Sequence, residues 1–305
     1  MGDDHGPVHG AVAPPAGPAS RDAAGASLWS DAWRQLRRNP LFVGPVVVIG
    51  LLTLIAVWPT LFTDLHPRDC DLARSSELPS MGHWFGFDRQ GCDYYTRVVF
   101  GTRASMAVGV LVTAGAFGLA VALGSLAGYY GGVIDTLISR LADIWFGIPL
   151  VLGAIVLLAA VPRRGVWEVS LVLVLLSWPP MMRLMRSTVL ATREADYIQA
   201  ARALGARDGR IIVRHVLPNA IAPVLSYATV FVGVVIAAEA TLSFLGAGLQ
   251  LPAISWGLLL AGPPARVLLD VPHLFVFPGL FVSLTVFSFV LLGDALRDAL
   301  DPRLR

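Results

Sequence analysis

Six separate stretches of about 20 apolar residues limit the possible folds of this chain more than any other feature. A membrane's hydrocarbon core is about 30 Å thick, and an apolar helix of that length crosses it. The stretches are Leu41–Phe62, Ser105–Tyr129, Ile134–Ala160, Trp167–Leu190, Ala220–Leu245 and His273–Gly293. Only 14% of the residues are charged and 55% are hydrophobic, against about 25% and 45–50% in an average soluble domain. We therefore expect an all-α membrane protein with six transmembrane helices.

The distribution of arginine predicts how this bundle is oriented. Basic residues cluster between Arg21 and Arg38, before the first apolar stretch, and the positive-inside rule places such a cluster in the cytoplasm. Six crossings return the C-terminus to the same side. On this topology residues 63–102 form the one sizeable outer loop, residues 191–219 form a long cytoplasmic loop, and residues 294–305 form a cytoplasmic tail.

Two segments precede the first apolar stretch. Residues 1–27 are rich in Ala, Gly and Pro and show no helical period, which is typical of a disordered tail. They do not resemble a signal peptide, because the first long apolar stretch begins only at Leu41. In residues 28–40, tryptophan and leucine fall on one side of a helix and arginine on the other. This pattern favours an amphipathic helix on the membrane surface over a plain soluble helix.

Several chemistries are excluded or left without support. All 23 basic residues are arginine, so the P-loop signature, which requires lysine, is missing and the chain is not itself a P-loop ATPase. The net charge is only +2 and the arginines are scattered, which gives no case for nucleic-acid binding. The sequence has no His-Glu-x-x-His motif and no cluster of cysteine and histidine, so we expect no metal site and no cofactor. The nucleophile motif of an intramembrane hydrolase is also missing. The residues themselves therefore give no support for these enzymatic activities.

The most informative motif lies in the expected cytoplasmic loop. Ala200 and Ala201 are followed by Gly205 and, after a basic stretch, by Leu217 and Pro218. Small residues let a short helix sit flush in a groove of a partner, and glycine can end that helix with a positive φ. Proline then marks the beginning of the fifth apolar stretch.

This spacing resembles the EAA loop of the membrane subunits of ATP-driven importers, the ABC transporters. The family pattern is Glu-Ala-Ala, three residues, Gly, then nine residues before Ile-x-Leu-Pro. Gln199 stands where the family has glutamate, and His215 where it has isoleucine. The resemblance implies that this loop docks into an ATPase subunit and transmits its closure to the spans. The residues assigned to this role are Tyr197, Gln199, Ala200, Ala201, Gly205, Leu217 and Pro218.

The resemblance covers most of residues 28–305 and is closest to the dipeptide, oligopeptide and nickel importers, in particular to their C-type permease. The matching residues and segments are Phe85–Asp93, Arg97–Arg103, Ala127–Gly132, Glu239, Leu242–Gly246, Ser255–Gly257, Phe277–Gly279 and Leu292–Arg303. The resemblance implies the type I importer permease fold over residues 41–293. It also implies location in the bacterial cytoplasmic membrane and import of peptides by alternating access.

The same resemblance implies a set of partners. A homologous six-helix permease completes a heterodimer, two P-loop ATPase subunits bind ATP and magnesium, and an extracytoplasmic binding protein delivers the solute. Two alternatives stay open. The solute could be nickel or another small molecule, or the chain could be a stand-alone channel or secondary transporter. The last would need matched broken helices in two halves of the chain, and no such repeat is evident.

Both cysteines fall in the expected outer loop. Cys92 stands where the importer family usually has an arginine, and Cys70 lies earlier in the same loop. A pair of exposed free thiols is unusual in an oxidising compartment, so we predict a Cys70–Cys92 disulfide. Two free thiols in an unrelated arrangement are the alternative.

Charge inside a membrane span is costly and usually faces protein or water, and Glu239, Arg140 and Asp143 are charged residues inside the expected spans. Glu239 could line the translocation path or bond to a neighbouring helix, and we favour helix packing. Arg140 and Asp143 are three residues apart, so they can pair on one helix face, and we expect that pair to be structural. Gly115, Gly118, Gly124 and Gly128 would let helices approach closely in lipid.

Overall fold

The computed structural model describes residues 36, 37, 39–261 and 270–300. The expected disordered tail, most of the expected surface helix and the last five residues of the chain therefore lie outside the described residues. Within these ranges the regular structure is helical apart from isolated β-bridges. The elements are α2 (Pro40–Val57), η2 (Pro59–Leu61), η3 (Leu72–Arg74), α3 (Tyr94–Tyr130), α4 (Gly132–Phe146), α5 (Leu150–Ala159), α6 (Val166–Arg193), α7 (Asp196–Ala203), α8 (Asp208–Ile211), the π-helical turn η4 (Ile212–Val216), α9 (Leu217–Phe244), α10 (Trp256–Leu260) and α11 (His273–Leu300).

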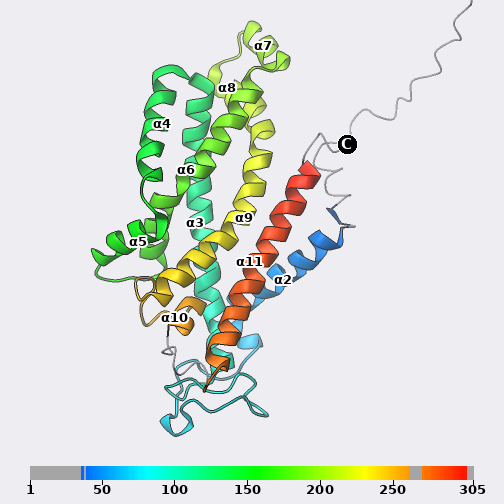
Figure 1. Ribbon diagram of the computed structural model, residues 1–305. Coiled ribbons are helices and arrows are strands. Elements are labelled where there is room, and N and C mark those ends of the chain that lie inside the picture. The colour runs from blue at the N-terminus through cyan, green and yellow to red at the C-terminus, as the bar shows by residue number, and fades with distance from the viewer. Residues whose placement is uncertain (1–35, 38, 262–269, 301–305) are drawn as a thin grey trace, which may run out of the picture.

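Five helices are long and apolar enough to cross a membrane: α2, α3, α6, α11, and α9 together with the turns before it. Helix α3 packs along α6 and α9, and α9 packs along α11, which in turn contacts α2. Figure 1 shows α7 at one end of this bundle and the loops before α3 at the other. We call these the α7 end and the loop end. The bundle confirms the all-helical membrane fold expected from the apolar stretches.

The third apolar stretch is not one straight span. The expectation of a single helix over Ile134–Ala160 is wrong, because α4 and α5 are separate helices bent by 83° at a short break. Pro149 explains the break. Proline has no backbone N–H to donate, and it disfavours the helical conformation of the residue before it, Ile148. The described residues thus contain five helices that are long and apolar enough to cross a membrane, and the expected number of six spans is reached if the bent pair counts as one.

Two helices extend beyond their expected ends. Helix α3 begins at Tyr94 instead of Ser105, because the side chain of Asp93 accepts a hydrogen bond from the N–H of Thr96 at 2.8 Å and caps the helix. The outer loop is correspondingly shorter than expected. Helix α11 continues to Leu300, so residues 294–300 are helix rather than tail.

Glycine brings α3 and α6 into close contact. A Cβ atom on Gly124 would lie 2.8 Å from the carbonyl oxygen of Met182, and one on Gly128 would lie 2.8 Å from that of Arg186. Both distances are too short for a real Cβ, so these two positions require glycine for the observed packing. Gly118 differs, since a Cβ there would meet nothing within 4 Å. At Gly115 a Cβ would lie 2.7 Å from Cγ2 of Val174 in α6. The expected close approach therefore holds at Gly115, Gly124 and Gly128 but not at Gly118.

Candidate functional site

Helix α7 ends in a turn that requires glycine. Gly205 has a φ of +79°, its N–H donates to the carbonyl of Arg202 at 3.0 Å, and the N–H of Ala206 donates to the carbonyl of Ala201 at 3.1 Å. These two bonds form a Schellman motif, in which a left-handed residue satisfies the last carbonyls of a helix. The sequence motif predicted this ending for the helix.

We call residues 196–216, from α7 through α8 to the π-helical turn, the α7 segment. One side of this segment is anchored in the core. Ile198 of α7, Ile211 of α8 and Val216 of the π-helical turn are completely buried. Polar bonds join the same segment to the end of α3. The hydroxyl of Tyr129 donates to Asp208 Oδ1 at 2.8 Å and accepts from Arg202 Nη2 at 3.4 Å. The segment is therefore fixed to the bundle rather than free to swing as a loop.

Arg193, the last residue of α6, secures the same corner. Its Nη1 donates to the carbonyl oxygens of Gly128 at 3.0 Å and Tyr129 at 3.1 Å. These carbonyls belong to the last turn of α3, where a helix has no donors of its own left. The α7 segment, the end of α3 and the end of α6 thus form one connected unit.

The opposite side of α7 faces outward. Tyr197 is 47% exposed and Leu204 is 88% exposed, while Ala200 is exposed and Ala201 is half-buried. Residues three, four and seven apart lie on one side of a helix, so these four side chains form a single surface, which we call the α7 face. Its side chains are small or apolar, which is unusual for the solvent-exposed side of a helix. Gln199 is also exposed, about 100° around the helix from Ala200.

Pro218 is the second residue of α9, as expected of a proline at the beginning of the fifth apolar stretch. The residues before it are also helical, so that helix runs without a break from Asp208 to Phe244 and widens into a π-helical turn at Ile212–Val216. Proline cannot donate to the carbonyl four residues before it, and a local widening is one way in which a helix accommodates it. The side-chain amide of Asn219 supports the widened turn by donating to the carbonyl of His215 at 2.7 Å.

The charged pair expected on the third span is only part of a larger set. Arg140 and Asp143 lie 3.9 Å apart and are both largely exposed, but Asp143 also receives Nη2 of Arg183 at 2.5 Å. One helical turn away, Arg186 binds both carboxylate oxygens of Asp135 at 2.5 and 2.6 Å. Two aspartates of α4 therefore pair with two arginines of α6. Sequence reasoning missed these pairs, although the arginines are spaced by three and the aspartates by eight.

Glu239 is completely buried in α9. Its Oε1 accepts hydrogen bonds from Ser243 Oγ at 2.7 Å and from Ser255 Oγ at 3.0 Å. In this conformation its carboxyl faces neighbouring elements of the protein. This geometry supports a role in helix packing.

At the loop end, Cys70 and Cys92 are joined by a disulfide. Next to it, Asp88 accepts hydrogen bonds from the N–H groups of Gln90 at 2.8 Å and Cys92 at 2.9 Å and forms an ion pair with Arg97 of α3. Because Asp88 and Arg97 are both largely buried, the ion pair and the disulfide together hold this loop against the beginning of α3.

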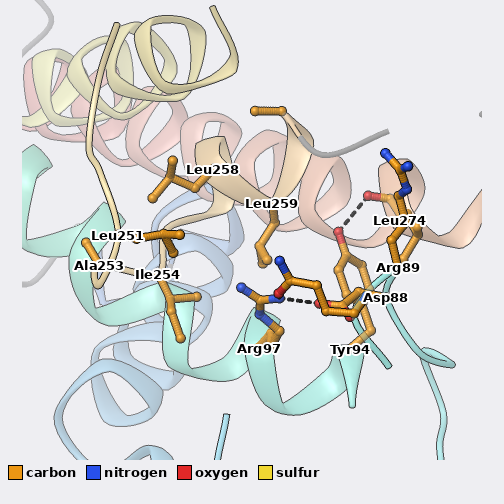
Figure 2. A pocket seen from close by; sticks show the side chains of 12 residues that line it. Asp88, Arg89, Tyr94, Arg97, Leu251, Ala253, Ile254, Leu258, Leu259 and Leu274 are labelled. Carbon is orange, nitrogen blue, oxygen red and sulfur yellow. Dashed lines mark hydrogen bonds and ion pairs between the residues drawn. The ribbon is translucent and has the colours of Figure 1, made fainter. Parts of the chain in front are cut away.

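A cavity of about 500 Å³ opens beside this ion pair. Figure 2 shows the polar side chains of Asp88 and Arg97 facing apolar side chains that include Ile254, Leu258 and Leu259. The hydroxyl of Tyr94 closes another part of the wall by donating to the carbonyl of Leu274 at 2.6 Å. The volume is within the range of pockets that hold small ligands.

Comparison with known proteins places this architecture in a family. Residues 120–305 match the family described as binding-protein-dependent transport system inner membrane component, and residues 27–79 match the N-terminal TM domain of oligopeptide transport permease C. The dipeptide transport system permease protein DppC of Alkalihalophilus pseudofirmus is 38% identical over 92% of this chain and 91% of its own length. The glutathione transport system permease protein GsiD of Pectobacterium atrosepticum is 37% identical over 94% and 95%. The oligopeptide transport system permease protein OppC of Bacillus subtilis is 35% identical over 92% and 91%. The chain therefore belongs to the binding-protein-dependent transport system inner membrane component family, as a membrane-spanning permease subunit.

Proposed function

We propose that the chain forms one half of the membrane pore of an ATP-driven importer of short peptides in a bacterial cytoplasmic membrane. Family membership supports the transport role, and relatives named for dipeptide and oligopeptide transport support peptides as the solute. The other half of the pore is a homologous permease. An extracytoplasmic binding protein delivers the peptide, and two ATPase subunits bind ATP and magnesium.

The proposed orientation places the α7 end in the cytoplasm. Five arginines lie between Arg193 and Arg214, in the segment that joins α6 to α9, and such clusters favour the cytoplasmic side. The disulfide at the loop end then faces the oxidising side of the membrane, where disulfides persist. Both observations favour the same orientation.

The proposed coupling role rests on the exposed α7 face. It presents Tyr197, Ala200 and Leu204 to the outside, while Ile198 and Arg202 on the other side of the same helix connect it to the core and to α3. An ATPase subunit that binds this face and moves when it binds ATP would displace α7 together with the helices that contact it. The bundle would then alternate between two states with different access to the peptide, as a coupling between two ligands requires.

Replacing Ala200 by glutamate tests this role. The charge would lie within the α7 face and lose its hydration when the ATPase subunit docks. A loss of roughly 1.4 kcal/mol in docking free energy is a factor of ten, so we expect ATP-driven peptide uptake to fall at least about tenfold. The abundance of the chain in membranes should not change, because the side chain is exposed in the free subunit.

Gln199→Glu is the matched control. It introduces the same charge one residue earlier, about 100° around the helix, at the position where the family pattern has glutamate. Because that pattern carries a charge at this position, we expect full uptake. Full uptake and full ATPase-subunit binding in the Ala200→Glu variant would contradict the coupling role of the α7 face.

A further inference from the structure

A single carboxyl group organises the loop end of α9. Glu239 Oε1 accepts hydrogen bonds from Ser243, one turn later in α9, and from Ser255, the residue that caps α10. All three residues are completely buried. The carboxyl therefore joins two helices that are separated by an extended segment of the chain.

Each serine connects the carboxyl to a backbone group. Ser243 Oγ accepts from the N–H of Leu249 at 3.0 Å, and Ser255 Oγ accepts from the N–H of Leu258 at 3.2 Å. A hydroxyl has one proton, and here that proton goes to Glu239 while the oxygen accepts from the backbone. Glu239 thus fixes the turn after α9 and the first turn of α10 at the same time.

The first residues of α10 are also locked to α3. Trp256 is completely buried, its N–H donates to Ser105 Oγ at 3.1 Å, and its indole Nε1 donates to the carbonyl of Val98 at 3.1 Å. A Cβ on Gly257 would lie 2.6 Å from Cα of Ala240, so α10 and α9 touch backbone to backbone. With so little space, α10 cannot shift along α9 unless the bonds to Glu239 break.

Helix α10 supplies part of the wall of the cavity at the loop end. Leu258 and Leu259 line it, facing Arg97 and Asp88 across the cavity in Figure 2. Helix α9 itself is continuous with the α7 segment through Asp208–Phe244. One continuous path of helix and side-chain bonds therefore leads from the α7 end, along α9, through Glu239, to the wall of this cavity.

From this path we infer that Glu239 is a positioning residue that carries movement of α9 to α10 and thereby sets the shape of the loop-end cavity during transport. The inference rests on the proposed function, because it requires an ATP-driven movement of α9. Among the described residues no cationic side chain bonds to Glu239, and its Oε2 has no hydrogen-bond partner. The network needs an acceptor at Oε1, which the amide of glutamine also provides.

The test uses the full transporter in proteoliposomes. Both native cysteines are in the disulfide, so Leu258→Cys introduces the only free thiol of this chain. A membrane-impermeant maleimide then measures how accessible the cavity wall is with and without trapped ATP. In an otherwise unchanged chain we expect the labelling rate to differ at least about fivefold between the two states. Adding Glu239→Gln should preserve that ratio and uptake, whereas Glu239→Leu should bring the ratio close to one and lower uptake about tenfold.

A milder variant tests the inference if the transporter with Glu239→Leu does not assemble. Ser255→Ala removes the bond to α10 and leaves the bond between Ser243 and Glu239 in place, so it should also bring the labelling ratio close to one. Ser288→Ala is the matched control. Ser288 is likewise buried, but its hydroxyl bonds only within α11, to the carbonyl of Leu284, and the ratio should not change.

Each other outcome overturns the inference. A labelling ratio preserved in Ser255→Ala shows that the network does not carry the movement, and a ratio lost in Glu239→Gln shows that the charge, not the acceptor, is required. A ratio of one in the Leu258→Cys background shows that α10 does not move. If that background still takes up peptide with ATP, the proposed function stands without the inference, and if it does not, both fail.

Discussion

Replacing Gly205 by alanine isolates the contribution of one backbone turn to the α7 segment. The residue has a φ of +79°, a conformation that costs an L-residue roughly 1–2 kcal/mol. A Cβ there would meet nothing within 4 Å, so no steric clash adds to this cost. One to two kcal/mol corresponds to a factor of about 5–30 in a local opening equilibrium.

Hydrogen–deuterium exchange of the purified protein measures this equilibrium directly. The amides of Gly205 and Ala206 donate the two bonds of the turn, so their exchange should become about 5–30 times faster in the Gly205→Ala variant. Gly205→Asn should fall in between, because asparagine tolerates the left-handed conformation better than alanine.

Gly209→Ala is the matched control. This glycine lies four residues further on, inside α8, outside the left-handed region, and an added methyl group there would meet open space. Alanine favours a helix by about 0.5–1 kcal/mol over glycine, so the turn at Gly205 should keep its protection. Equal exchange in the Gly205→Ala and Gly209→Ala variants would refute the argument that the left-handed turn holds α7 in place.

Two further predictions concern bonds at the two ends of the bundle. Mass spectrometry of peptides digested without reduction should recover Cys70 and Cys92 as one crosslinked species, and alkylation of both thiols would contradict the disulfide. At the other end, Asp135→Asn leaves the guanidinium of Arg186 without its bidentate partner and should lower the free energy of unfolding in detergent by about 1–3 kcal/mol. Asp143→Asn should lower the free energy of unfolding less, because the Asp143–Arg183 pair is more exposed. An equal decrease in both variants would contradict this ranking.

Local sequence patterns predicted the parts of the fold that depend on local physics. Apolar stretches about as long as a membrane is thick indicated the helices that cross it, because length and hydropathy alone decide that property. Gly205 indicated the end of α7, because few residues other than glycine adopt its conformation readily. The long register from Ala200 to Pro218 indicated the family, which the comparisons confirm.

Features that depend on distant contacts were not predictable in the same way. Pro149 is a local signal for the bend between α4 and α5, but the apolar residues on both sides of it made the stretch look like one continuous span. The early start of α3 depends on a cap by Asp93 inside what looked like a loop. The bonds from Glu239 to Ser255 join residues whose proximity follows only from how α10 folds back onto α9.

Isolating the intact assembly from its host shows whether this chain is half of an ATP-driven permease. The chain would be tagged, purified in mild detergent and analysed together with its associated proteins by mass spectrometry, and the same sample would be assayed for peptide uptake in liposomes. We expect one homologous permease, two P-loop ATPase subunits and uptake that requires ATP. A homo-oligomer of this chain that transports solute without ATP would contradict this expectation.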